Sequence, residues 1–308
     1  MFKAVSFSIA ALAALVSVHV HADRALWSDL DSSKAPMSAE RFTPATTGRT
    51  LALQHTALLA KLSGAPSEAV IRVPESSLVL ELPMPDGSFD SFRIVETAVM
   101  APELAARFPQ IKTYLAQSIS DPGVTARLDT TTLGFRAQFL SSKGTIYIEP
   151  LARGDLSRYI AFNKKDDTAE RPPMRCNVTG EVFKSTPEGL RKNAIEPLAT
   201  GANLRTYRLA VATTGEYAAQ FGGTKADALS GIVTTMNRVN GIFEREAAVR
   251  MQLVANNDLV IFTNGATDPY DNNDSRAMLG QNQTTLTSII GGANYDIGHV
   301  FTTGGGGV

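Results

Sequence analysis

The sequence predicts a protein of mixed α+β class, in which a β-rich first domain is followed by an α/β domain with a mixed sheet. Three observations predict it. Short alternations of apolar and polar residues, separated by turn residues, fill residues 69–163. A charged, proline-containing stretch at 164–204 has no periodicity, as is typical of a linker. Continuous apolar runs then alternate with segments of helical period. We therefore expect domains at 23–163 and 205–308.

Residues 1–22 have the pattern of a secretory signal peptide. Lys3 gives a basic start, Val5 to Val18 is almost wholly apolar, and Val20 to Ala22 offers permissive residues for cleavage. The apolar run is shorter than the ~20 residues that span a bilayer. We expect cleavage before Asp23 and a secreted or periplasmic protein, with no membrane contact after cleavage; the alternative is an uncleaved anchor.

Composition narrows the classes of partner. With 29 basic and 30 acidic side chains, the chain offers no electrostatic attraction for nucleic acid or for an anionic membrane surface. A single cysteine, Cys176, cannot form an intramolecular disulfide, so the fold must be held by its cores and perhaps by metals. Nothing in the composition sets the oligomeric state.

The first domain is predicted to begin with an irregular lead-in at 23–50 and a short helix over Thr50–Leu62. His55 lies near the apolar stripe of that helix, and we interpret it as a surface or packing residue because no second metal ligand follows four residues later. A further helix is expected at Pro102–Ala116. The expected strands are Leu78–Leu82, Phe89–Val95, Val124–Leu128, Gly134–Leu140 and Thr145–Glu149.

The second domain is predicted to alternate strands and helices. Thr224, with Asp227 three residues later, is expected to cap a long helix that ends near Glu246. Asp274 is expected to cap a second helix that stops at Gly291. The expected strands are Tyr207–Ala212, Val249–Val254, Leu259–Phe262 and Tyr295–Thr303.

Parts of both domains resemble a known family. Thr206–Tyr217, the helix after it and the strand that runs into Gly304–Gly307 resemble the amino-terminal half of a reprolysin-like zinc metalloprotease, a branch of the metzincins. The ordered fragments Leu82–Gly87, Met100–Leu104, Phe108–Tyr114, Gly134–Phe135 and Ile148–Pro150 resemble the propeptide of bacterial members. A generic secreted β-sandwich is the alternative for the first domain.

The resemblance implies the precursor of a secreted zinc metalloendopeptidase that hydrolyses protein or peptide substrates. The family's metal helix, His-Glu-x-x-His-x-x-Gly-x-x-His, is missing from this sequence, whose only histidines are His19, His21, His55 and His299. We therefore expect that the chain is truncated, that the zinc ligands lie beyond Val308, and that no catalytic residue is present. The chain as given should be inactive.

The resemblance also implies a site on the last strand. Gly298, His299, Val300 and Phe301 correspond to the edge strand of the metzincin substrate cleft, which pairs with an extended peptide by strand addition. These residues would position the peptide and break no bond. The alternative is that His299 is simply a polar residue on a sheet face.

Two metal hypotheses remain. Pro172–Val178 resembles the cysteine-switch segment of metzincin propeptides, which makes the Cys176 thiolate a zinc ligand of the zymogen; the alternative is an inert packed cysteine. Asp268, Asp271 and Asp274 could hold calcium, but their spacing departs from a calcium loop, and a solvated turn with a helix cap is the alternative.

A rival function comes from a different class. The chain could be a non-catalytic exported binding protein whose second domain resembles a protease and has lost its metal helix. The reading frame after Val308 separates the two hypotheses, since His-Glu-x-x-His there supports the protease and a native stop codon supports the binding protein.

Overall fold

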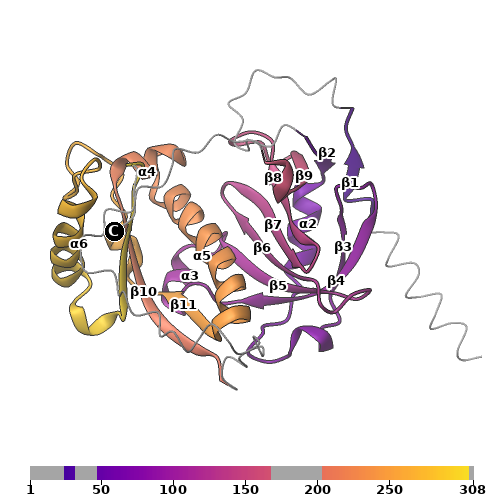
Figure 1. Cartoon of the computed structure of the whole chain (residues 1–308), viewed down its shortest axis with the longest axis horizontal. Helices are drawn as coiled ribbons and strands as arrows, with labels where there is room; N and C mark the ends of the chain where they lie inside the picture. Colours follow the sequence, from indigo (N-terminus) through magenta and orange to yellow (C-terminus); the bar gives the residue numbers. More distant parts are fainter. Residues whose placement is uncertain (1–23, 32–46, 168–202, 305–308) are drawn as a thin grey trace, which may run out of the picture. The chain divides into compact units, whose positions relative to one another are not determined.

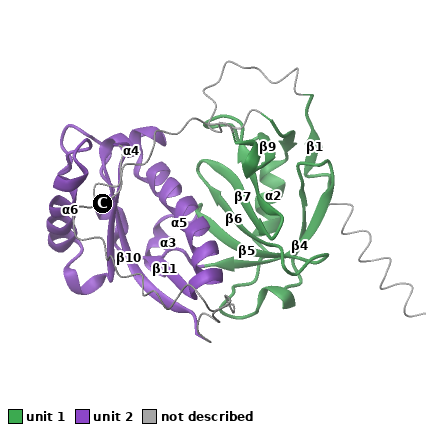
Figure 2. Cartoon of the chain, viewed as in Figure 1, with its two compact units in different colours: residues 1–97, 110–169 green, residues 98–109, 170–308 purple. Residues whose placement is uncertain are grey.

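The computed structural model describes residues 24–31, 47–167 and 203–304, which form two compact units (Figures 1 and 2). The first unit comprises residues 1–97 and 110–169, and the second comprises 98–109 and 170–308. The expected signal peptide, Cys176 and most of the expected linker lie outside the described residues. No helix within the described ranges is long and apolar enough to cross a bilayer.

The first unit is built on a nine-stranded antiparallel sheet in the order β1-β2-β9-β8-β7-β6-β5-β4-β3 (Figure 1). Most neighbours in the sheet are also neighbours in sequence, and short connections join β3 to β4 and each successive pair from β5 to β9. The strands are β1 (Trp27–Asp29), β2 (Arg49–Leu53), β3 (Val79–Pro83), β4 (Phe89–Thr97), β5 (Lys112–Ser118), β6 (Thr125–Thr131), β7 (Gly134–Ser141), β8 (Gly144–Pro150) and β9 (Arg158–Asn163). Helix α2 (His55–Leu62) and the short 3-10 helices η2 (Val73–Glu75) and η3 (Lys164–Asp166) complete the unit.

The apolar side of this sheet and two leucines of α2, Leu58 and Leu62, form the core of the first unit. Trp27 takes part in this core, although it lies in the segment expected to be an irregular lead-in. Its ring meets Phe135 and Tyr159 edge-on, with centroids 6.0 and 5.7 Å away. The lead-in expectation was therefore wrong at this point, because burial of Trp27 and antiparallel pairing of β1 with β2 hold this three-residue strand on the sheet.

Two helix predictions in the first half of the chain were partly wrong. The expected helix over Thr50–Leu62 is strand β2 followed by α2. The expected helix over Pro102–Ala116 is α3 (Pro102–Arg107) followed by strand β5. Pro109 explains the second error, because a residue before proline disfavours the helical conformation, and Phe108 has φ −127° and ψ 59°.

The second unit contains a small sheet in the order β11-β10-β12, in which β10 (Arg205–Thr213) pairs in parallel with both β11 (Val249–Leu253) and β12 (Ile297–Phe301). The chain thus combines a large antiparallel sheet with a small parallel one, which confirms a fold of mixed class. The expectation of a mixed sheet in this unit was wrong for the described residues. Helical connections return each strand to the same end of the sheet and so make it parallel.

The helices of the second unit besides α3 are α4 (Gly215–Gln220), α5 (Lys225–Ala247) and α6 (Ser275–Ile289), with 3-10 helices η5 (Asn257–Val260) and η6 (Gly292–Asn294). Both predicted caps are confirmed. The Thr224 hydroxyl accepts the Asp227 N–H, and Asp274 accepts two N–H groups in the first turn of α6. The expected strand Leu259–Phe262 was wrong, since η5 occupies its start.

Candidate functional site

One edge of the parallel sheet is covered from within the second unit. Residues 98–101 run beside β11, where the Leu253 N–H donates to the Val99 carbonyl and the Ala101 N–H donates to the Leu253 carbonyl, both at 2.8 Å. The Asn240 side chain pairs with both backbone groups of Met251, at 2.8 and 2.9 Å. The β11 edge therefore has little room for another strand.

The opposite edge is open. Strand β12 pairs with β10 on one side and has no strand on the other among the described residues. The Phe301 carbonyl faces β10, because it accepts the Thr214 N–H at 3.0 Å. Backbone groups of successive residues in a strand point to opposite sides, so Gly298 and Val300 direct their N–H and C=O groups toward the open edge.

The two faces of β12 differ in chemistry. Val300 packs against the core cluster that includes Met278 of α6, and a Cβ on Gly298 would lie 2.6 Å from Leu286 Cδ1. On the other face His299 and Phe301 stack edge-on, with ring centroids 5.3 Å apart. One face of the strand is therefore closed by α6 and the other carries aromatic rings.

A cavity of about 520 Å³ borders the open edge of β12. Tyr217 of α4 and Phe221, the residue after that helix, form one wall, with their ring centroids 4.8 Å apart. The Tyr217 ring centroid lies 5.4 Å from that of Phe301. Met278 and Leu279 of α6 contribute aliphatic surface, and Leu279 is 56% exposed. The cavity is therefore lined by apolar groups beside backbone groups of β12 that have no strand partner in the described part of the chain.

Both ends of β12 are anchored. Before the strand, the Asp296 carboxylate accepts the Arg208 backbone N–H and a guanidinium N–H, each at 2.7 Å, and these bonds lower the pKa of Asp296 below its usual range. After it, Asn272 Oδ1 accepts the Thr302 hydroxyl at 2.5 Å, and Asn272 Nδ2 donates to the Thr303 hydroxyl at 3.0 Å. The position of the strand along the sheet is thereby fixed.

The four residues that sequence analysis placed on an edge strand, Gly298 to Phe301, all lie on β12. The pKa of His299 is below its usual range, because the surrounding protein disfavours the imidazolium, although the residue as a whole remains exposed. Sequence analysis did not identify the aromatic wall. Tyr217 stands in a segment that carried the family resemblance, but nothing in the sequence placed it opposite Phe301.

The acidic loop before α6 has the character of a turn with a helix cap. Asp274 caps α6, Asp271 accepts the Asn273 N–H at 3.1 Å, and Asp268 accepts the Gly215 N–H at 2.7 Å. Within the described ranges, no group of three or more His, Cys, Asp or Glu residues could hold a metal ion. The calcium hypothesis therefore gains no support from the arrangement.

The described residues do not fit a zinc site either. Their only histidines are His55 and His299, and these lie in different units. A catalytic zinc needs three protein ligands and an open position. The described part of the chain assembles no such set.

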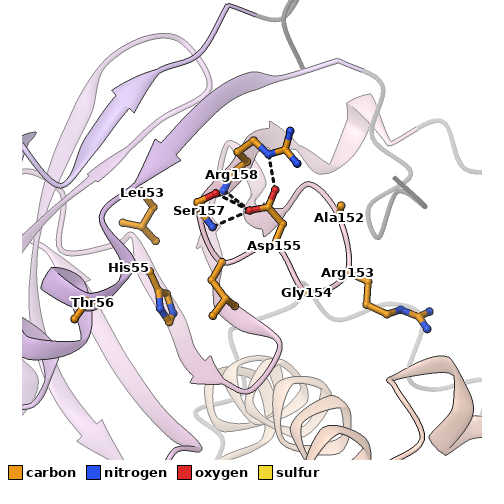
Figure 3. Close-up of a pocket in the computed structure, with 10 residues that line it drawn as sticks. Leu53, His55, Thr56, Ala152, Arg153, Gly154, Asp155, Ser157 and Arg158 are labelled. Carbon is orange, nitrogen blue, oxygen red and sulfur yellow. Dashed lines mark hydrogen bonds and ion pairs between the residues drawn. The ribbon is translucent and has the colours of Figure 1, made fainter. Parts of the chain in front are cut away.

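A second cavity, of about 830 Å³, lies in the first unit between the start of α2 and the turn before β9 (Figure 3). Burial opposes ionisation of Asp155, but hydrogen bonds from Ser157 and Arg158 lower its pKa overall. His55 faces the same cavity, and burial lowers its pKa, because it disfavours the charged imidazolium. Its Nε2 atom is buried and has no hydrogen-bond partner among the described residues.

Part of the second unit is similar to a known protein family. Residues 203–307 match the family described as "Metallo-peptidase family M12B Reprolysin-like". This segment holds β10, β11, β12 and the helices between them, and it is similar to a metallopeptidase domain. The match does not extend to residues 1–202.

No curated protein matches the chain. A solved structure entitled "Structure of a chaperone-substrate complex" matches at 10% identity, covers 42% of this chain and 92% of that chain, and has a TM-score of 0.29. At that score the match bears on neither the fold nor the function of this chain.

Proposed function

We propose that the second unit binds an extended peptide by strand addition at β12, as the substrate-positioning part of a secreted zinc metalloendopeptidase precursor. The observation that carries the proposal is the difference between the two sheet edges. The β11 edge is covered, whereas the β12 edge is open among the described residues and borders a cavity. The match of residues 203–307 to a metallopeptidase family supports a peptide substrate.

The geometry supplies both parts of such recognition. The N–H and C=O groups of Gly298 and Val300 would bond the peptide main chain, which gives affinity without dependence on sequence. Alternate side chains of the peptide would meet the aromatic face at Phe301 and Tyr217 or the aliphatic surface of α6. Export, latency held by Cys176 and zinc ligands beyond Val308 belong to the same proposal.

Replacing Val300 with proline is expected to weaken peptide binding. The substitution removes one N–H from the open edge and leaves the pairing with β10 in place, because proline is tolerated where its nitrogen faces away from the sheet. Loss of one main-chain hydrogen bond, together with the clash of the proline ring, should weaken binding by about tenfold or more. The measurement is fluorescence anisotropy of a short labelled peptide that alternates leucine and threonine.

Val300→Thr is the matched control, since it keeps both the N–H and the branched shape, and it should bind as the parent does. A second probe is a pair of the same peptides, one N-methylated at its odd positions and the other at its even positions. One of the two should bind and the other should not, because only alternate N–H groups of the peptide face β12. Equal binding of the peptide to the parent and to Val300→Pro would refute the proposed site.

The 308-residue chain itself is expected neither to retain zinc through dialysis nor to cleave casein. The physical reason is that the described residues provide no set of three zinc ligands. Metal analysis of the dialysed protein and a casein assay with added zinc measure the two outcomes. Stoichiometric zinc in the dialysed chain would contradict this expectation, whereas peptide binding at β12 is independent of it.

A further inference from the structure

Residues 98–109 join the second unit although they lie between two strands of the first unit in the sequence. The chain leaves the antiparallel sheet at the end of β4, and it returns to form β5. Between these strands it supplies the segment beside β11 and helix α3. A cut anywhere in 168–202 would therefore divide the second unit. Residues 98–109 would stay on the N-terminal fragment, and the rest of the described second unit would be on the C-terminal fragment.

Backbone hydrogen bonds hold this segment as an added strand. The Leu253 N–H donates to the Val99 carbonyl and the Ala101 N–H donates to the Leu253 carbonyl, each at 2.8 Å, and Met100 forms a parallel bridge with Leu253. Gln252 adds a side-chain bond to the Ala98 carbonyl at 3.2 Å. Without the segment, both backbone groups of Leu253 would lose their partners.

Side chains reinforce the attachment. Arg107 of α3 donates to Asp258 Oδ1 at 2.7 Å and also to the Ala255 carbonyl. Val99 and Met100 are 3% and 6% exposed. The segment thus combines main-chain pairing, burial of apolar side chains and an ion pair, which are the components of a stable intramolecular interface.

We infer that residues 98–109 act as a built-in strand donor that keeps the first unit bound to the second after the connection between them is cut. The ligand is this segment, which stays covalently joined to the first unit after the cut, and its binding surface is the β11 edge with Asp258. Cleavage within 168–202 then produces a non-covalent complex. Release of the second unit requires that the added strand leave β11, which would open that edge as well.

The test uses the full chain with a site-specific protease sequence inserted within residues 168–202. After cleavage, confirmed on a denaturing gel, the two fragments are expected to elute together in native size-exclusion chromatography. Ala101→Pro removes the N–H that bonds Leu253, and the existing φ of −58° at Ala101 suits proline. Ala101→Ser is the matched control, because it keeps that N–H.

Ala101→Pro should weaken association of the cut fragments by about tenfold or more, while Ala101→Ser should associate as the parent does. Arg107→Asp should also weaken it, and adding Asp258→Arg should restore part of the loss. Melting of each uncut variant shows that it folds. Separation of the parent fragments, or equal association of all variants, would overturn the inference.

Discussion

Gly215→Ala is expected to destabilise the second unit by about 3 kcal/mol or more. A Cβ at this position would lie 2.0 Å from the Gly265 nitrogen and 2.3 Å from the Asn264 carbonyl carbon. Both are backbone atoms, so relief requires the whole loop to move. That movement would also break the 2.7 Å bond from the Gly215 N–H to Asp268.

Gly280→Ala is the matched control, because Gly280 lies within α6 and a Cβ there would meet nothing within 4 Å. Alanine favours the helix and should stabilise the unit by up to about 1 kcal/mol. Urea unfolding followed by circular dichroism measures both changes in free energy. If the two variants change stability in the same direction, the close approach of Gly215 to the backbone at Asn264 and Gly265 does not explain the loss of stability.

Trp27→Ala is expected to cost the first unit about 3–5 kcal/mol of stability. The indole is 4% exposed, and its contacts with Phe135 and Tyr159 would be replaced by a cavity. Trp27 is the single tryptophan of the chain, so its variant has no tryptophan fluorescence. Unfolding of the variant is therefore followed by circular dichroism, and unfolding of the parent by circular dichroism and tryptophan fluorescence.

Two further variants separate volume from polarity at this position. Trp27→Phe should cost much less than Trp27→Ala, since it keeps an aromatic ring and removes an indole N–H that is buried without an acceptor among the described residues. Leu156→Ala, at a side chain that is 36% exposed, should change stability by about 0.5 kcal/mol or less. A small effect of Trp27→Ala would mean that β1 does not contribute to the core.

Local patterns predicted the second unit well where one physical cause dominated. Residues 207–212 lie within β10, and 209–212 are apolar and buried, which fits a strand covered on both faces, whereas Tyr207 and Arg208 at its start are exposed. Thr224 and Asp227 bond each other as a cap requires, so the start of α5 was predictable to the residue. The apolar residues at helical spacing after the cap then predicted the rest of α5.

The errors arose where a local pattern fitted two structures. Leu51 and Leu53 are buried at a spacing of two, as in a strand, yet Leu51 with Leu58, Leu59 and Leu62 also fits one face of a helix. At 259–262 the apolar run favoured a strand. There the Asn257 side chain bonds both backbone groups of Val211, at 2.7 and 3.0 Å, and so takes the place of a strand partner.

The site was predictable only in part. The residues of β12 could be identified because the segment resembles a known edge strand, but which edge of the sheet stays open depends on residues distant in sequence. Val99 covers the β11 edge by bonding Leu253, and no local pattern at either position indicates that pairing. The aromatic wall likewise depends on Tyr217 of α4 meeting Phe301 of β12.

The anchors at the two ends of β12 have a consequence for the order in which a peptide's residues can be presented. Arg208 with Asp296 before the strand and Asn272 with Thr302 after it prevent a one-residue slip, which would exchange the aromatic and α6-facing sides. In the proposed mode of binding, the fixed register of β12 determines which positions of a bound peptide face the aromatic rings and which face α6. Consider two peptides of the same composition in which the pattern of apolar residues is shifted by one position. Their apolar side chains would point to opposite faces of β12, so the site would distinguish them by this shift alone.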